Sequence, residues 1–268
     1  MGVIFEPGYT LPVNDQPLTH ARIAHSSNWI AGTVTASSTA TDYFADGPDN
    51  SMTYEKWQPT SLLIAATWEL DFGGSNAVDY CCIAAHNMGT KGNNLQVQRF
   101  DSRSWTDMIA TTAITDDMPI LVIFTSTADT KYRIRISSGS APTIGVIRFG
   151  AALQMPRPMY GGISPFDLAR ETKFQSNTSV TGEFLGRTKQ RSHFNVGLNW
   201  NNIPAAWVRS NWRTFQLAVE TEPFFVAWRP ETFSEVAYVV ASGNPSASNM
   251  GVRDLMALSV SGKGYGYD

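Results

Sequence analysis

Short β-prone runs separated by turn residues fill the first half of the chain. In one of them Tyr132, Ile134 and Ile136 alternate with polar residues, and residues 95–100 alternate in the same way. A period of two is typical of a strand with one buried face. Regular short strands with turns between them indicate a sandwich or barrel. The predicted strands are 29–37, 62–72, 78–85, 95–100, 119–125, 131–137 and 143–149.

The second half combines strands with one helix near 203–220. Apolar residues spaced by four, three and four form a single helical stripe, which consists of Val208, Trp212, Phe215 and Val219. Asn201 or Asn202 is the expected cap, Pro204 suits the first turn, and Pro223 ends the helix. Strands are predicted over 184–200, 224–228, 236–241 and 255–260.

Proline and glycine divide the chain into four parts. Residues 1–27 contain three prolines and little periodicity, so we expect an extended N-terminal arm with at most one edge strand. Residues 153–162 contain two prolines and a glycine pair, which predicts a linker. The domains are therefore expected at 28–152 and 163–268, and the fold class is mainly β.

Five motifs in the first half resemble discoidin domains, also called coagulation-factor type C or galactose-binding-like domains. They fall in the family's order at 44–57, 68–73, 101–106, 131–136 and 144–150. The resemblance implies a jelly-roll β-sandwich over about 28–151, with Trp57, Trp68 and Trp105 in its scaffold. It also implies a binding module, often for sugars, that recognises its ligand through loops at one end of the sandwich.

The second half resembles bacteriophage tail-tip proteins, such as distal tail proteins and tail-tube-like sandwiches. The resemblance is carried by Leu185 to Thr188, the helix with Trp212, and the strands at 223–228 and 236–238. It implies a homo-oligomeric ring that contacts other tail proteins. The expected location is therefore the virion, assembled in the host cytoplasm, and the N-terminus shows no secretory signal.

Charge and cysteine content narrow the expected partners. The 268 residues carry a net charge of −3 and no basic run, so no nucleic-acid partner is expected. No segment is long and apolar enough to suggest membrane insertion. Cys81 and Cys82 are adjacent in a predicted strand, where their side chains point to opposite faces, so we expect buried thiols rather than a disulfide.

Loop residues supply the candidate binding groups. Planar amides, an arginine and a histidine in or beside the predicted loops are candidates for carbohydrate binding: His86, Asn87, Asn93, Asn94 and Arg103. Carboxylate and amide oxygens also suit calcium, and the candidates are Asp46, Asp49 and Asn50. The alternative is that these three residues only form the turn, which we favour, and no other cofactor is predicted.

The predicted function is a structural subunit of a bacteriophage tail tip that displays the sandwich to host glycans or to other tail proteins. Trp207 lies off the apolar stripe of the helix and is the candidate subunit contact. A free carbohydrate-binding module is the first alternative. A glycan-degrading enzyme is the second, and it needs paired carboxylates in one cleft, for example among Glu183, Glu220, Glu222 and Asp167. We expect no catalysis.

Overall fold

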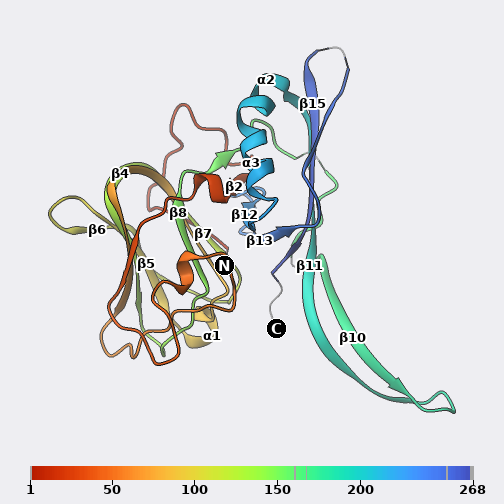
Figure 1. Ribbon diagram of the computed structural model, residues 1–268, viewed down its shortest axis with the longest axis horizontal. Helices are drawn as coiled ribbons and strands as arrows, with labels where there is room; N and C mark the ends of the chain where they lie inside the picture. Colours follow the sequence, from red (N-terminus) through yellow and green to blue (C-terminus); the bar gives the residue numbers. More distant parts are fainter. Residues whose placement is uncertain (1, 160, 167, 252, 266–268) are drawn as a thin grey trace.

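Two β-sheets, both largely antiparallel, form the framework of the molecule. The computed structural model describes residues 2–159, 161–166, 168–251 and 253–265 (Figure 1). The first sheet has the order β3-β4-β7-β5-β6, with β1 paired to β7 and β8 paired to β4. Its strands are β1 (Val3–Phe5), β3 (Thr33–Ala36), β4 (Ala66–Ala84), β5 (Asn94–Phe100), β6 (Trp105–Ala113), β7 (Ile120–Ser137) and β8 (Val146–Gly150). The predicted mainly β fold class is confirmed.

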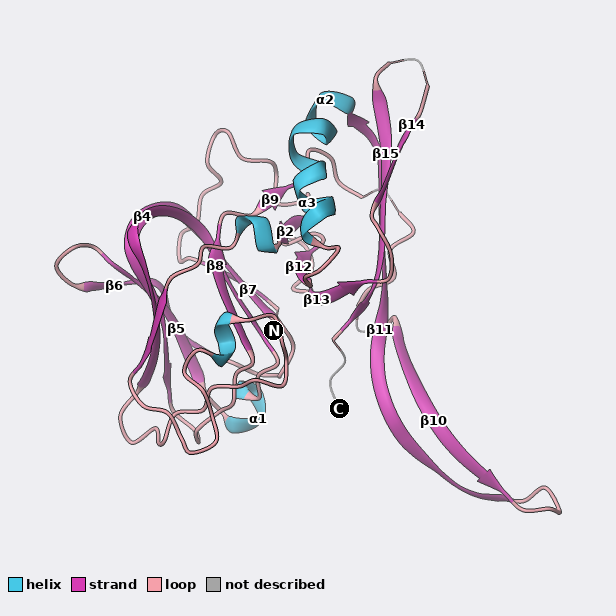
Figure 2. Ribbon diagram, viewed as in Figure 1, coloured by secondary structure: helices cyan, strands magenta, loops and turns pink. Residues whose placement is uncertain are grey.

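β4 and β7 are long strands that belong to both layers of the first sandwich. Figure 2 shows β4 arching over its top. The β4–β7 register shifts between Asp71 and Asn76, and Gly73 in this stretch has a φ of 68°. Such irregularities bend a strand without ending it. The predicted strands 62–72 and 78–85 are in fact the single strand β4, and the predicted strands 119–125 and 131–137 are the single strand β7, so these predictions were wrong. The strand β6 was not predicted.

The core of the sandwich lies between these two layers. Trp57 and Trp68 are fully buried in it, together with Tyr132 and Phe149. The expectation for Trp105 was wrong, because this residue is only partly buried and lies outside the core clusters. Its indole instead packs against Arg133, whose guanidinium carbon is 3.9 Å from the ring centre. A cation held over the face of an indole at an exposed site adds about 0.5–1 kcal/mol.

The second sheet has the order β10-β11-β15-β13-β12-β2-β9, with β14 paired to β15. Its strands are β2 (Arg22–Ala24), β9 (Leu153–Gln154), β10 (Arg170–Thr178), β11 (Phe184–Pro204), β12 (Phe224–Ala227), β13 (Val236–Ala241), β14 (Ser246–Asn249) and β15 (Leu255–Gly264). The predicted strands at 224–228, 236–241 and 255–260 are confirmed. The outer parts of β10 and β11 form a two-stranded ribbon that projects from the molecule (Figure 2).

One helical segment covers this sheet, as its apolar stripe predicts. It comprises α2 (Ala205–Trp207), a π-helical turn at Val208–Trp212, and α3 (Arg213–Ala218). All four stripe residues are buried against the sheet. The predicted asparagine cap was wrong, because β11 continues to Pro204, which is itself the cap. The fixed φ of proline suits this direct change from strand to helix.

The two sheets also share a core. Tyr80 and Cys82 of β4 and Leu121 of β7 pack with Phe225 and Tyr238 of β12 and β13. The adjacent Cys81 belongs to the core inside the sandwich, so the two free thiols face opposite sides as predicted. Burial raises the pKa of both thiols well above the usual range. The second sheet is therefore packed directly on the sandwich.

The segments expected as arm and linker both contribute strands. In residues 1–27, β1 joins the first sheet, and β2 lies inside the second sheet between β12 and β9. β2 is interior because Ala21, Ile23 and Ala24 are apolar and bury completely or nearly so. In residues 153–162, β9 pairs with β2, while residue 160 lies outside the described residues.

The remaining helical turns are short. They are α1 (Met88–Lys91) and the 3-10 turns Ser26–Asn28 and Gly47–Asp49. Over the described residues, no helix combines the length and the apolar character that crossing a bilayer requires.

Candidate functional site

An open groove lies between the loop at 42–56 and the second sheet. It consists of two adjoining hollows of about 640 and 650 Å³ that share Thr53, Tyr54 and Tyr265. Residues 42–44 and 53–56 line one hollow. The other extends over the middle of β11 and the ends of β13 and β15. We call these two hollows together the groove.

Two tryptophans fix the loop onto the sandwich. The indole N–H of Trp57 donates to the carbonyl oxygen of Ser38 at 2.9 Å, and that of Trp68 donates to Ala45 at 2.7 Å. Both rings are fully buried. Buried indoles need a hydrogen-bond partner, and here Ala45 in the loop and Ser38 shortly before it provide their carbonyl oxygens. The tryptophans of the motifs therefore set the position of one wall of the groove.

Two further contacts tie the loop to more distant strands. Nη1 of Arg148 in β8 lies 2.6 Å from Oδ1 of Asp49. Burial raises the pKa of Asp49, although Arg148 acts in the opposite direction. The hydroxyl of Tyr238 in β13 donates to the carbonyl oxygen of Ser51 at 2.7 Å. The groove is thus bounded on both sides by elements that the cores hold in place.

Exposed apolar and aromatic side chains line the groove. Tyr54 is 74% exposed, Phe44 58%, Val240 58% and Met52 45%. Large apolar groups that face solvent together mark binding surfaces. Charged side chains stand among them, namely Asp42, Glu55, Lys56 and Lys263. A hollow that offers aromatic ring faces and a few polar groups suits a ligand that has both apolar and polar surfaces.

A polar cluster lies where the groove meets the base of the ribbon. Nδ2 of Asn195 donates to Oε2 of Glu171 at 2.7 Å, and Nε2 of His193 is 3.4 Å from the same oxygen. The hydrogen bond from Asn195 and the nearby His193 lower the pKa of Glu171. His193 lies at the edge of the groove, which Ser192 and Lys263 also line.

Four of the predicted sugar-binding residues lie near α1 and serve the scaffold. His86 is buried, with Nε2 2.8 Å from the carbonyl oxygen of Met118, and burial lowers its pKa to about 4. Asn93 is fully buried and donates to Ser138 and Ser140. Asn87 and Asn94 bond to Thr143 and Ser138 respectively. His86 and Asn93 are enclosed, so they cannot meet a ligand at the surface.

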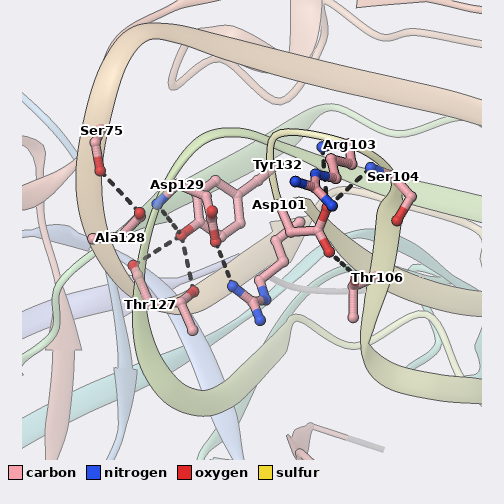
Figure 3. Close-up of polar contacts among 10 residues, drawn as sticks. Ser75, Asp101, Arg103, Ser104, Thr106, Thr127, Ala128, Asp129 and Tyr132 are labelled. Carbon is pink, nitrogen blue, oxygen red and sulfur yellow. Dashed lines mark hydrogen bonds and ion pairs between the residues drawn. The ribbon is translucent and has the colours of Figure 1, made fainter.

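Arg103 lies at the other end of β5, in the exposed turn shown in Figure 3. Oδ1 of Asp101 accepts hydrogen bonds from the backbone N–H groups of Arg103 and Ser104. The seven-residue strand β5 separates this turn from Asn94 by roughly 20 Å, at about 3.3 Å per residue. The five candidates therefore do not form one site.

The network beside this turn is structural. The hydroxyl of Tyr132 donates to the carbonyl oxygen of Thr127 and accepts from the backbone N–H of Asp129 (Figure 3). Nη1 of Arg99 lies 2.7 Å from Oδ2 of Asp129. These contacts join β7, where it bends, to the end of β5.

The calcium candidates are engaged by other groups. Asp49 pairs with Arg148, and a guanidinium in that place competes with a cation. Asn50 donates to Glu55 at 2.6 Å and accepts from the backbone of Met52. Asp46 precedes the 3-10 turn at Gly47–Asp49. Across the described ranges, no group of three or more His, Cys, Asp or Glu side chains is placed to hold a metal ion. The turn-forming alternative agrees with these contacts.

Trp207 is half-buried against the core of the second sheet, at the start of the helical segment. Of the carboxylates considered for catalysis, Glu183 lies in the turn at the end of the ribbon, whereas Glu220 and Glu222 follow α3 (Figure 1). Asp167 lies outside the described residues. The ribbon therefore separates Glu183 from the other two.

Phe44, Tyr54 and His193 were not predicted as site residues from the sequence. One signal in the sequence pointed to the first two, since an aromatic residue in a polar turn-rich loop has few ways to be buried. His193 had no such signal, because its place beside the loop follows from packing between distant strands.

Among the comparisons with known proteins, only the one with solved structures finds similar chains. No protein-family model matches the chain, and no curated protein sequence matches it. A chitosan-binding module from a Paenibacillus sp. IK-5 chitosanase/glucanase is 16% identical and has a TM-score of 0.39; the match covers 46% of this chain and 98% of the module.

Two further solved structures show similar sequence identities and TM-scores. The family 32 carbohydrate-binding module of Clostridium perfringens NanJ, solved with galactose, is 14% identical with a TM-score of 0.40, covering 46% of this chain and 97% of the module. A Ruminococcus gnavus fucosidase is 16% identical with a TM-score of 0.40, covering 48% of this chain and 28% of the enzyme. Each similarity extends over less than half of this chain.

Proposed function

We propose that this chain is a non-catalytic, saccharide-binding structural subunit and that the groove is its ligand site. The observation that carries the proposal is the exposure of Tyr54 and Phe44 in a hollow that also holds charged side chains. Sugar rings present C–H faces that pack on aromatic rings and hydroxyl groups that bond to polar side chains. The groove offers both kinds of contact side by side.

We propose binding rather than hydrolysis. Oε2 of Glu55 accepts a hydrogen bond from Asn50 and so helps to hold the loop, which is a structural role. The other carboxylate of that hollow, Asp42, has a left-handed φ of 67° in the same loop. Incubation with soluble polysaccharides tests this point, and release of new reducing ends would contradict it.

We place the subunit in a bacteriophage tail tip, where it would contact other tail proteins and a host cell-surface glycan. The sequence resemblance of the second half supports this setting, and so does a groove that stays open beside a projecting ribbon (Figure 2). Several copies on one particle strengthen weak sugar contacts through multivalency. Light scattering of the purified protein separates this proposal from a free carbohydrate-binding module, which would be a sugar-binding monomer.

The decisive experiment measures binding to a set of neutral, amino-sugar and acidic polysaccharides by affinity electrophoresis and calorimetry. Tyr54→Ala removes a ring that is 74% exposed, so it leaves the fold intact. We expect it to weaken binding by about tenfold, which corresponds to about 1.4 kcal/mol. The matched control is Leu63→Ala, which removes an apolar group that is 96% exposed and lies outside the groove. Equal affinity in both variants would contradict the assignment of the site.

A further inference from the structure

The two hollows of the groove differ in charge. We call the one over β11, β13 and β15 the sheet hollow, and the one lined by residues 42–44 and 53–56 the loop hollow. The charged side chains of the loop hollow are Asp42, Glu55 and Lys56. Among the described residues, the sheet hollow is lined by Lys263 and His193 and by no carboxylate. A negatively charged group of a ligand is therefore favoured in the sheet hollow.

Strand pairing gathers the polar side chains of the sheet hollow on one face of the second sheet. Lys263 in β15 is opposite Asn195 of β11 and opposite Val240 of β13. Opposed residues of paired strands lie on the same face, and so do residues two apart in one strand, such as His193 and Asn195. Phe194 between them points the other way, into the core. Lys263 is thus at the centre of an exposed patch on the face that bounds the groove.

The ammonium group of Lys263 is accessible to a ligand. The side chain is exposed, and it forms no ion pair among the described residues. The nearby acid is Glu171, whose Oε2 accepts a hydrogen bond from Asn195 and which does not line the hollow. That hydrogen bond, and then the charges of His193 and Lys263, lower the pKa of Glu171. Glu171 is therefore a weak competitor of an anionic ligand for the lysine.

An uncharged surface adjoins this cation in the same hollow. The ring of Tyr54 is 74% exposed and Val240 is 58% exposed, and both line the sheet hollow with Lys263. The volume of about 640 Å³ lies within the range of about 300–1,000 Å³ that is common for small-molecule sites. One saccharide unit can thus place a charged group beside the lysine while the next unit packs on the tyrosine.

The loop hollow disfavours a second negative charge. Tyr54 and Tyr265 line both hollows, so a chain that crosses Tyr54 continues toward Asp42 and Glu55. Like charges brought together across an interface cost affinity and so help to exclude wrong partners. A saccharide in which acidic and uncharged units alternate therefore fits the groove better than one in which every unit is acidic.

We infer that the groove takes an anionic saccharide, with the charged group of one unit beside Lys263 and an uncharged neighbouring unit on Tyr54. A lysine ammonium acts as a compact point charge, so the charged group is a carboxylate or a sulfate. This inference rests on the proposed saccharide binding by the groove and adds the class of saccharide.

The test compares hyaluronan, in which acidic and uncharged units alternate, with its carboxyl-reduced form, by calorimetry on the full chain. We expect the unreduced polymer to bind about fivefold tighter at about 0.05 M salt, a gain typical of an exposed ion pair. The difference should shrink at about 0.5 M salt, because the Debye length falls. Chondroitin sulfate compared with unsulfated chondroitin measures the preference for a sulfate in the same way.

Three charge variants locate the origin of the preference. Lys263→Gln should remove most of it and leave the affinity for the reduced polymer unchanged. Glu171→Gln removes the competing carboxylate, so it should raise the affinity for hyaluronan by about twofold. The matched control is Arg209→Gln, which removes one positive charge at an exposed position on the helical segment and should change neither affinity.

The outcomes separate this inference from the proposed function. Saccharide binding with no preference for the charged form of either pair of polymers would overturn the inference and leave the proposed function intact. Equal losses in Lys263→Gln and Arg209→Gln would also overturn it, because the preference would then come from net charge alone. Absence of binding to every polysaccharide, neutral ones included, would overturn the proposed function and the inference together.

Discussion

The hydroxyl of Tyr238 in β13 donates a 2.7 Å hydrogen bond to the carbonyl oxygen of Ser51, in the loop that forms the opposite wall of the groove. These residues are separated by 187 positions in the chain. Tyr238 is 2% exposed and belongs to the core shared by the two sheets. The bond therefore couples the packing of the two sheets to the shape of the groove.

Tyr238→Phe should loosen that wall. The substitution keeps the ring and removes one hydrogen bond, so we expect the free energy of unfolding to fall by about 1 kcal/mol. Saccharide affinity should fall as well, because the loop becomes more mobile, and hydrogen exchange of residues 50–54 should become faster. Urea unfolding and exchange mass spectrometry measure these effects. Unchanged exchange in the loop would show that the bond does not hold it.

Asp79 should make the stability depend on pH. Burial raises its pKa from 3.8 to about 7, and Oδ1 accepts a hydrogen bond from the backbone of Ala152. The unfolded carboxyl ionises near pH 4, whereas the folded one resists ionisation until about pH 7. Its stabilising contribution is therefore complete below about pH 4 and is lost as the pH rises to about 7.

Asp79→Asn keeps the acceptor and removes the ionisation. We expect the variant to gain stability relative to the wild type as the pH rises from about 4 to about 7, by up to about 4 kcal/mol. Buried His25 and His86, whose pKa values are lowered to about 4, act in the opposite direction. They occur in both proteins, so the difference in unfolding free energy isolates Asp79. Parallel pH profiles would contradict this prediction.

Alanine substitution of Trp57 and of Trp105 should lower stability by very different amounts, although both residues occur in the motifs of the first half. Trp57 is fully buried, so Trp57→Ala should lower the free energy of unfolding by about 3–5 kcal/mol. Trp105 lies on the outer face under Arg133, so Trp105→Ala should cost about 1 kcal/mol or less. Denaturant unfolding measures both, and similar losses would contradict the placement of Trp105.

Asp49 should act as the counter-ion of Arg148 and not as a metal ligand. A chelator should leave the melting temperature of the wild type unchanged. Asp49→Asn leaves the largely buried guanidinium of Arg148 without its carboxylate. We therefore expect the free energy of unfolding to fall by about 3 kcal/mol or more. Calorimetry with and without calcium and chelator tests both points. Stabilisation by calcium that disappears in Asp49→Asn would contradict the assignment.

Local sequence patterns were enough to predict most of the elements and part of the core. The alternation in 131–137 predicted a strand with Tyr132 and Ile134 inside, and the spacing of Val208, Trp212 and Phe215 predicted the buried face of the helix. Adjacent Cys81 and Cys82 were expected on opposite faces and are found in different cores. These features follow from periodicity, which depends only on neighbours along the chain.

The tertiary structure decided how segments that lie far apart in the sequence pack against one another. Residues 21–24 look like part of an arm, yet the apolar side chains of Ala21, Ile23 and Ala24 fill an interior position of the second sheet. His86 and Asn93 look like loop residues, yet packing encloses them. The groove joins Tyr54 to His193 across 139 positions of sequence, and the ribbon is exposed because no other strand among the described residues pairs with it. Sequence periodicity fixes which face of an element is apolar, whereas long-range packing determines what covers that face.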